Sequence, residues 1–110
     1  MTSKPVVPRQ LARDDIEQAV DHYLGEAGQD IALGFIDAVE NTFQLIADNP
    51  ASGSPRWGHD LNLPGLRSCK LKRFPWIVFY LERDDHIDVW RVLHGQRDLP
   101  TWMREPEAGS

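Results

Sequence analysis

Residues 76–94 read WIVFYLERDDHIDVWRVLH, and this stretch decides the fold. The first part, Trp76 to Leu81, is apolar on both faces, which is typical of a central strand. A polar turn of residues 83–86 follows, and apolar and polar residues then alternate as far as His94. The stretch therefore predicts two strands separated by a turn. The alternation places on one face of the second strand Ile87, Val89, Arg91 and Leu93.

The segment before this stretch predicts one more strand, preceded by a long loop. Residues 66–73 alternate, with Cys69 and Leu71 on one face and Lys70 and Lys72 on the other. Cys69 lies in mid-strand, where a buried structural thiol is the usual role. Residues 50–65 are rich in Pro, Gly and Ser, so we expect a loop of irregular structure there.

Two amphipathic helices are predicted in the first half of the chain. Apolar residues recur at helical spacing from Ala12 to Leu24 and from Ala32 to Ile46. The carboxylates of the first segment, Asp15 included, fall on the opposite, solvated side. A link of only a few residues at Gly25–Gly28 makes the two helices an antiparallel hairpin. Before them, the proline-bracketed residues 5–8 read as a marginal first strand.

The predicted order is β-α-α-β-β-β, an α+β domain in which a helical hairpin packs on a small antiparallel sheet. A chain of 110 residues is one domain by length. We expect that domain to span residues 1–104 and residues 105–110 to be a disordered tail.

Composition excludes several classes of protein. Hydrophobic residues make up 41% and charged residues 26%, as in ordinary globular domains. The longest apolar run, residues 74–81, is far shorter than the ~20 residues that cross a bilayer, and the amino end carries no apolar signal core. One cysteine cannot form an internal disulfide, which fits a reducing cytoplasm. We therefore expect a cytoplasmic protein with no membrane partner.

Charge is unevenly distributed along the chain. The formal net charge of −5 argues against non-specific coating of nucleic acid, so we expect no direct specific nucleic-acid binding. Between Asp60 and Glu82 there is no acidic residue, but the segment holds four basic ones. This basic run is either a surface that contacts an anionic partner or a solvated strand face. Its members are Arg67, Lys70, Lys72 and Arg73.

Motifs for catalysis or cofactor binding are missing from the sequence. The four histidines do not pair with Cys69 or with one another at metal-ligand spacing, so we expect no metal and no cofactor. His94 and Arg97 could bind phosphate or act as general acid and charge stabiliser. The same segment, residues 94–98, also suits a simple turn at Gly95. Trp57 and Trp102 lie in the loop and near the carboxyl end, where an exposed tryptophan would suggest a partner surface.

Five segments in a fixed order resemble the RelE/ParE superfamily of type II toxins, and within it the ParE branch. The resemblance covers about residues 5 to 102. The segments are LIADNP (45–50), Gly53-x-Pro55-Arg56, PGLR (64–67), KRFPWIVFY (72–80) and Val89-x-Arg91-Val-Leu-His-Gly-x-Arg97-Asp98.

This resemblance implies a toxin that is neutralised by an antitoxin encoded beside it, here one similar to ParD. ParE-like members inhibit DNA gyrase by trapping its cleaved DNA complex, and they have no catalytic residues of their own. For the contact with gyrase we expect Arg67, Arg97 and Trp102. For the contact with the antitoxin we expect Lys70, Lys72, Arg73 and Trp57.

An antitoxin tail that folds on binding could cover the helical hairpin and a sheet edge. The basic run would then meet acidic antitoxin residues. The outward acidic rows of the helices would either face solvent, which we favour, or meet antitoxin Lys and Arg. These rows hold Asp14, Glu17, Asp21, Asp37 and Glu40.

Two alternatives stay open. RelE-like members cut mRNA in the ribosome with a basic cluster plus a carboxyl-terminal tyrosine or a histidine. Here the tyrosines are Tyr23 and Tyr80, and none follows Arg97. His94 could still take the part of the histidine in such a nuclease, with Arg97, Lys72 and Arg73 as the basic cluster. The negative net charge weakens an RNA contact. The second alternative is an inactive toxin homologue that acts only as an antitoxin partner.

Overall fold

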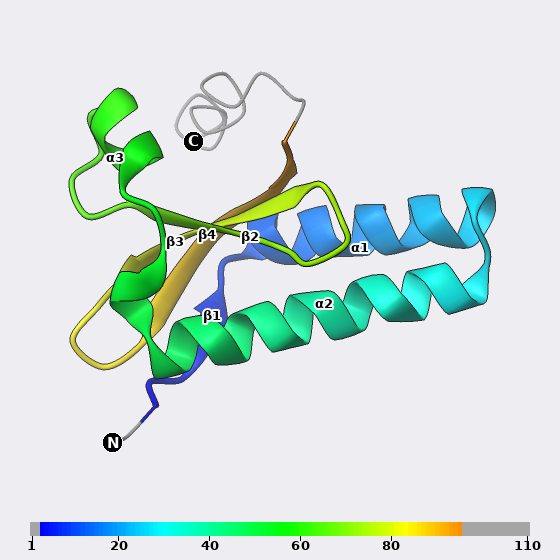
Figure 1. Cartoon of the computed structure of the whole chain (residues 1–110), viewed down its shortest axis with the longest axis horizontal. Coiled ribbons are helices and arrows are strands. Elements are labelled where there is room, and N and C mark those ends of the chain that lie inside the picture. Colours follow the sequence, from blue (N-terminus) through cyan, green and yellow to red (C-terminus); the bar gives the residue numbers. More distant parts are fainter. Residues whose placement is uncertain (1–2, 96–110) are drawn as a thin grey trace.

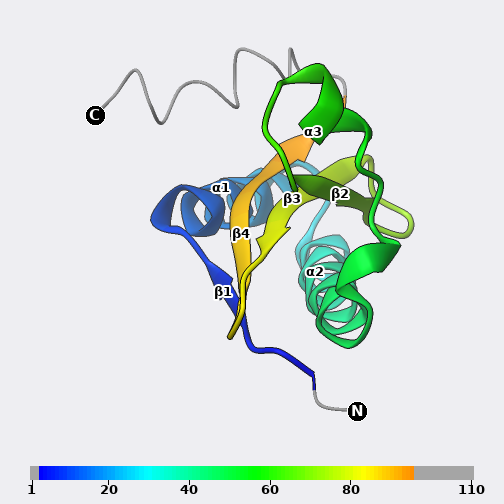
Figure 2. The same ribbon diagram turned by 90° about the vertical axis from the view of Figure 1, so that its left-hand side faces the viewer.

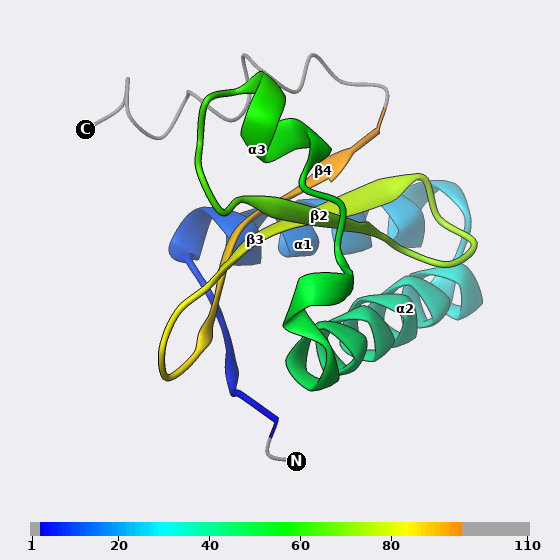
Figure 3. The ribbon, with the colours of Figure 1, turned by 60° about the vertical axis from the view of Figure 1, so that its left-hand side comes forward.

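The computed structural model describes residues 3–95 and places two long helices against a four-stranded sheet (Figure 1). Helices α1 (Gln10–Glu26) and α2 (Gln29–Asp48) form a hairpin on one side of the sheet, and the short helix α3 (Arg56–Asp60) lies on the other side (Figure 3). The predicted α+β class and the β-α-α-β-β-β order are confirmed. The strands are β1 (Val6–Pro8), β2 (Arg67–Lys70), β3 (Trp76–Glu82) and β4 (Ile87–His94).

The sheet has the order β1-β4-β3-β2 and is mixed, where the sequence predicted an antiparallel one. Strands β2, β3 and β4 are antiparallel to their neighbours, but β1 runs parallel to β4. No hairpin turn joins β1 to β4, so nothing in the connectivity forces them to be antiparallel. Two hydrogen bonds end this parallel pair, from Ile87 N to Pro5 O at 2.8 Å and from Arg9 N to Val89 O at 2.9 Å.

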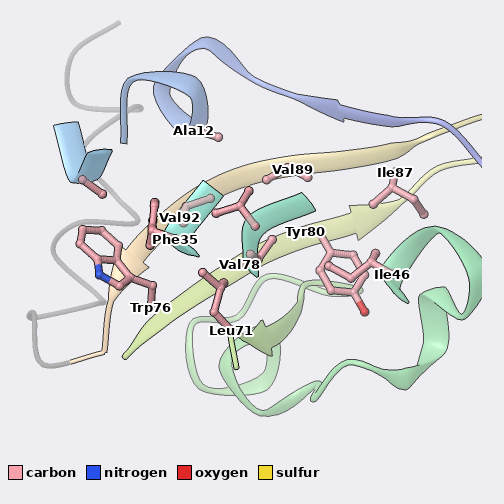
Figure 4. Close-up of a cluster of buried hydrophobic side chains, with 12 residues drawn as sticks. Ala12, Phe35, Ile46, Leu71, Trp76, Val78, Tyr80, Ile87, Val89 and Val92 are labelled. Carbon is pink, nitrogen blue, oxygen red and sulfur yellow. The ribbon is translucent and has the colours of Figure 1, made fainter. Parts of the chain in front are cut away.

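The main core lies between the helical hairpin and the sheet (Figure 4). The predicted helical faces are confirmed, since Ala12 and Ala19 of α1 and Phe35 and Ile46 of α2 are buried in this core. Gly28 has φ +96°, a left-handed conformation that glycine adopts at little cost, and it connects the two helices within a few residues. This tight link lets both helices cover the same face of the sheet.

A second, smaller core covers the other face of the sheet. Leu66, Phe79 and Leu93 form its centre, and Trp57 of α3 packs against it. The region expected to be an irregular loop therefore contains a 3-10 turn, η1 (Pro50–Ser52), and α3. A side chain at Gly58 would bring its Cβ to 2.5 Å from Leu66 O, so only glycine fits this close approach of α3 to the chain before β2.

A β-bulge in β4 changes the predicted alternation. Tyr80 pairs with Val89 and Phe79 pairs with Arg91, so Trp90 is an extra residue on β4. A bulge re-aims the side chains that follow it. Val92 consequently joins Val89 in the core under the helices, whereas Leu93, expected on the same face as Val89, joins the core on the opposite side.

Strand β2 is shorter than predicted. It ends at Lys70, and residues 71–75 form a turn closed by a hydrogen bond from Leu71 N to Trp76 O at 3.0 Å. Arg73 has φ +72° in this turn, which a strand could not accommodate. Lys72 and Arg73 thus lie on a turn between β2 and β3 and not on a strand face.

Candidate functional site

A groove runs between α2 and the turn that joins β2 to β3. Its volume is about 1000 Å³. In Figures 2 and 3 the connection between β2 and β3 lies alongside α2, which forms the opposite wall. We call this feature the α2 groove. Its lining consists of Tyr23, Asp30, Ile31, Gly34, Asp37, Ala38, Asn41, Thr42, Leu45, Lys70, Lys72, Arg73, Phe74 and Pro75.

The helical wall of the groove carries one largely apolar row along its length. Gly34, Ala38 and Thr42 are spaced four residues apart, so they lie on one side of α2. Ile31 and Leu45 stand at the two ends of this row, with 43% and 50% of their surfaces exposed. The Thr42 hydroxyl donates to Ala38 O at 2.8 Å, so its polar atom is satisfied within the helix. This wall therefore presents an apolar stripe with a shallow centre.

The opposite wall carries three of the four residues of the basic run. Lys70, Lys72 and Arg73 are exposed, and none of them takes part in an ion pair within residues 3–95. On the helical side, Asp30 and Asp37 are exposed. The two walls thus have opposite charge, with the apolar stripe between them.

A cluster of aromatic rings fixes the turn to the helices. Phe74 lies 5.4 Å from both Tyr23 and Phe35, measured between ring centroids. Trp76 packs on Phe35 at 5.6 Å, and its Nε1 donates to the Tyr23 hydroxyl at 3.0 Å. Because this cluster joins α1, α2 and the start of β3, the basic turn is held in place although β2 is short.

The structure corrects the position of Asp15, which the sequence placed on the solvated side of the first helix. Asp15 is only 9% exposed, and its two carboxylate oxygens each accept a hydrogen bond from Arg91 at 2.8 Å. The same carboxylate accepts the backbone N–H of Val92 at 3.1 Å. This ion pair ties α1 to β4 beside the bulge. Helical spacing alone could not reveal it, because the two partners are 76 residues apart.

Four of the five acidic residues expected on the outward rows of the helical hairpin are exposed, as predicted. Glu17, Asp21, Asp37 and Glu40 are exposed, and Asp14 is half-buried. A second buried carboxylate, that of Asp88, lies near the start of β4. Asp88 pairs with Arg9 at 2.9 Å and with Arg83 at 3.1 Å. Burial raises the pKa of Asp88, but the hydrogen bonds from Arg9 and Arg83 outweigh it and leave the pKa below its ordinary value.

The predicted antitoxin contacts fall into two separate places. Lys70, Lys72 and Arg73 come together in the α2 groove. Trp57 lies on the other side of the sheet, where its ring packs edge-on against Phe79 at 6.4 Å between centroids. It is half-buried and belongs to the second core.

Of the predicted gyrase contacts, one lies within the described residues. Arg67 is half-buried, and its Nη1 donates to Gly53 O at 2.8 Å, so it helps to hold the segment before α3. Arg97 and Trp102 lie outside the described residues 3–95.

His94, the candidate general acid, ends β4 beside the basic turn. Its ring lies 5.5 Å from that of Trp76 between centroids, and the next residue, Gly95, donates its N–H to Pro75 O at 2.8 Å. His94 is therefore at the same end of the sheet as Arg73.

Burial also raises the pKa of two further side chains, Cys69 and Tyr80. The pKa of the Cys69 thiol is raised by burial, which suits the expected structural role. Burial likewise raises the pKa of Tyr80, whose hydroxyl donates to Pro50 O at 2.7 Å and accepts from Gly53 N at 3.1 Å.

Within residues 3–95, no group of three or more His, Cys, Asp or Glu side chains is arranged to hold a metal ion. Every helix among these described residues is too short or too polar to span a bilayer.

Comparisons with known proteins agree with this architecture. The family model described as "ParE toxin of type II toxin-antitoxin system, parDE" matches residues 6–99. Among solved structures, a chain from "Chromosomal ParDE TA system from P. aeruginosa" superposes with a TM-score of 0.70 at 20% sequence identity. The match covers 84% of this chain and 96% of that one, and it shows a shared fold. No curated protein sequence matches the chain.

Proposed function

The chain belongs to the ParE toxin family of type II toxin–antitoxin systems, and on that premise we propose that it inhibits DNA gyrase by binding and that a ParD-like antitoxin neutralises it. The toxin would act in the cytoplasm, where gyrase works on DNA. The chain itself would break no bond.

The positions and hydrogen bonds of the two tyrosines are the observation that favours a binding mechanism over RNA cleavage. The chain has Tyr23 and Tyr80 as its only tyrosines. The Tyr80 hydroxyl is bonded to the backbone of Pro50 and Gly53, and the Tyr23 hydroxyl accepts a hydrogen bond from Trp76. Both hydroxyls have hydrogen-bond partners inside the fold, and neither tyrosine follows Arg97 at the carboxyl end, where a RelE-like mechanism places its tyrosine.

Two surfaces are proposed for the two partners. Gyrase would contact Arg67, Arg97 and Trp102. The antitoxin would contact the basic turn at Lys70, Lys72 and Arg73, where three exposed cations favour a carboxylate-rich partner. Trp57 completes the antitoxin set as a separate contact on the other side of the sheet, with the part of its ring that packing leaves accessible.

A supercoiling assay tests the proposed target. Relaxed plasmid, purified gyrase and ATP are incubated with increasing amounts of the chain. We expect supercoiling to stop at excess toxin and to resume when the product of the adjacent antitoxin gene is added first. The matched control is Asp37→Ala, an exposed change that should inhibit as the wild type does, whereas Arg67→Ala should inhibit less. Full supercoiling at excess wild-type chain would contradict the proposal.

One observation favours an mRNA endonuclease as the second candidate. His94 ends β4 next to the basic turn, so an imidazole and the cations Lys72 and Arg73 share one end of the sheet, with Arg97 following in the sequence. Cleavage of a ribosome-bound message by the wild-type chain, lost in His94→Ala, would support this candidate. If the chain affects neither gyrase nor message but binds the antitoxin, it is an inactive homologue that acts only as antitoxin partner.

A further inference from the structure

The connection between α2 and β2 is held firmly at Gly53. The Gly53 N–H donates to the Tyr80 hydroxyl at 3.1 Å, and Gly53 O accepts from Arg67 Nη1 at 2.8 Å. The Tyr80 hydroxyl also donates to Pro50 O at 2.7 Å. Arg67 and Tyr80 lie opposite each other in the register of β2 and β3, so their side chains reach Gly53 from the same face of the sheet. We call Gly53, Arg67 and Tyr80 the Gly53 clasp.

The Gly53 clasp leaves no room for a side chain at position 53. A Cβ on Gly53 would collide with the Tyr80 hydroxyl and would lie 3.0 Å from Ser68 O. The φ of Gly53 is −69°, which any residue adopts, so glycine is needed here for space and not for its backbone freedom. The peptide backbone is therefore in direct contact with the tyrosine, and both its N–H and its C=O are bonded.

Ser54 connects the Gly53 clasp to α3. Its backbone exchanges two hydrogen bonds with that of Ser68 in β2, both of 2.9 Å. Its hydroxyl accepts the N–H of Arg56, the first residue of α3, at 3.3 Å. The start of α3 is thus fixed to the sheet through Gly53 and Ser54, and a loss at the clasp should displace it.

Arg56 is the cation that this arrangement presents to solvent. Its side chain is 73% exposed, and its guanidinium lies 5.3 Å from the centroid of the Trp57 ring. Its ion pair with Asp60 is long, at 3.9 Å, and exposed, so it contributes little and a carboxylate of a partner could replace it. Arginine and tryptophan are the residue types that dominate binding energy at protein interfaces. Long connections that are held in an ordered form commonly carry function.

From these features we propose that α3 is part of the gyrase contact, with Arg56 meeting a carboxylate of gyrase, and that Arg67 and Tyr80 are positioning residues that act through Gly53. The inference rests on the proposed function and refines it. Arg67 belongs to the proposed gyrase contact, but its Nη1 is bonded inside the fold. Tyr80 is fully buried, so it can influence gyrase only through the segment that it holds.

Removal of the Tyr80 hydroxyl tests the positioning role. In the supercoiling assay with the full chain, Tyr80→Phe should raise the half-inhibiting concentration by at least about threefold, because Gly53 loses one anchor. Arg67→Ala should act in the same way, and Arg67→Lys, whose ammonium can still donate to Gly53 O, should recover part of the loss. The double variant should lose less than the product of the two single effects, because both act on one segment. Two effects that multiply fully would contradict a shared clasp.

A matched control separates positioning from general destabilisation. Ile16→Val shortens a partly buried side chain of α1 that packs on the main core, and it should lower the urea midpoint to a similar extent. It should nevertheless inhibit gyrase as the wild type does. If Ile16→Val loses as much inhibition as Tyr80→Phe, the effect is a global one and the positioning role is wrong.

Truncation of Arg56 tests the contact itself. Arg56→Ala should raise the half-inhibiting concentration by at least about tenfold and leave the urea midpoint unchanged. Arg13→Ala, which removes an exposed arginine of α1, should inhibit as the wild type does. Wild-type inhibition by Arg56→Ala would overturn the contact. A mobility shift of plasmid DNA by the chain alone, lost in Arg56→Ala, would make phosphate the ligand and would overturn it too.

Failure of this inference can be told apart from failure of the proposed function. If the wild type stops gyrase and both Arg56→Ala and Tyr80→Phe stop it equally well, the proposed function stands and the inference is wrong. If the wild type does not stop gyrase, the proposed function fails, and the partner assigned to α3 fails with it. Hydrogen exchange then still decides the clasp. The Ser54 amide should exchange faster in Tyr80→Phe and in Arg67→Ala, and unchanged exchange would overturn the positioning role.

Discussion

At the scale of single residues, the buried ion pair Asp15–Arg91 joins α1 to β4. The Asp15 carboxylate accepts two hydrogen bonds from Arg91 and one from Val92 N. Removing one partner of such a pair typically costs about 3–5 kcal/mol, because a charge stays behind in the interior. The sequence does not predict this pair. An acidic residue on the polar side of an amphipathic helix is expected to be exposed unless its partner is known.

We predict that Asp15→Ala lowers the free energy of unfolding by about 3 kcal/mol in urea denaturation. Glu17→Ala, an exposed change two residues along the same helix, should stay within about 0.5 kcal/mol of the wild type. Equal stability of the two variants would show that the pair does not hold α1 to β4.

Arg73 has a backbone conformation that is unfavourable for a residue with a side chain, and it carries a positive charge that would bind the antitoxin. Its φ of +72° costs a side-chain-bearing residue about 1 kcal/mol or more, and glycine avoids this cost. We predict that Arg73→Gly is at least as stable as the wild type in urea denaturation and yet binds the antitoxin more weakly in calorimetric titration. Arg73→Ala should weaken binding to the same extent without the gain in stability. Unchanged affinity in both variants would contradict a binding role for this turn.

Asp88 gives the fold a dependence on pH. Its pKa in the folded protein lies below the ordinary value of 3.8, so the unfolded chain takes up a proton more readily. The stabilisation is therefore complete above about pH 5 and is lost as the pH falls through 4 and below. We predict that the unfolding free energy of Asp88→Asn falls less steeply below pH 5 than that of the wild type. Asp37→Asn, an exposed change, should keep the wild-type slope, and parallel curves for all three proteins would contradict this account.

At the scale of the elements, the periodicity of apolar residues predicts those features that depend on residues close together in the sequence. The helical faces of α1 and α2 and the apolar strand β3 follow from spacing, since each buries one face or both against the core. The parallel pairing of β1 depends on contacts between the two ends of the chain. The bulge at Trp90 inverts the alternation in mid-strand, and no turn residue marks it in the sequence. The α2 groove likewise depends on where the turn after β2 lies in space.

Helix α3 shows how one element depends on a single glycine. A Cβ at Gly58 would lie 2.5 Å from Leu66 O and 2.9 Å from Leu63 O, both backbone atoms that cannot move aside alone. We predict that Gly58→Ala destabilises the fold by about 1–3 kcal/mol. Gly25→Ala is the matched control, because Gly25 lies within α1 with no atom inside 4 Å of the added Cβ. It should stabilise by about 0.5–1 kcal/mol in urea denaturation, and a stabilising Gly58→Ala would contradict this account.

At the scale of the whole molecule, opposite charges gather on the helical hairpin and on the turn after β2. The helical hairpin is acidic on its outer side, while the cations gather on the turn after β2. An antitoxin bound to Lys70, Lys72 and Arg73 would therefore cover the basic wall. The sequence predicted the cations as a group, but their position opposite an apolar stripe emerged from the fold.

The central claim is that this chain stops gyrase by binding and cuts nothing itself. Its most direct test is the DNA left after gyrase, plasmid, ATP and the chain are mixed and then treated with detergent. The account predicts that linear plasmid accumulates with the chain present, because gyrase is held with its DNA cleaved, while a ribosome-bound message treated in parallel stays whole. Intact plasmid together with a cleaved message would contradict it.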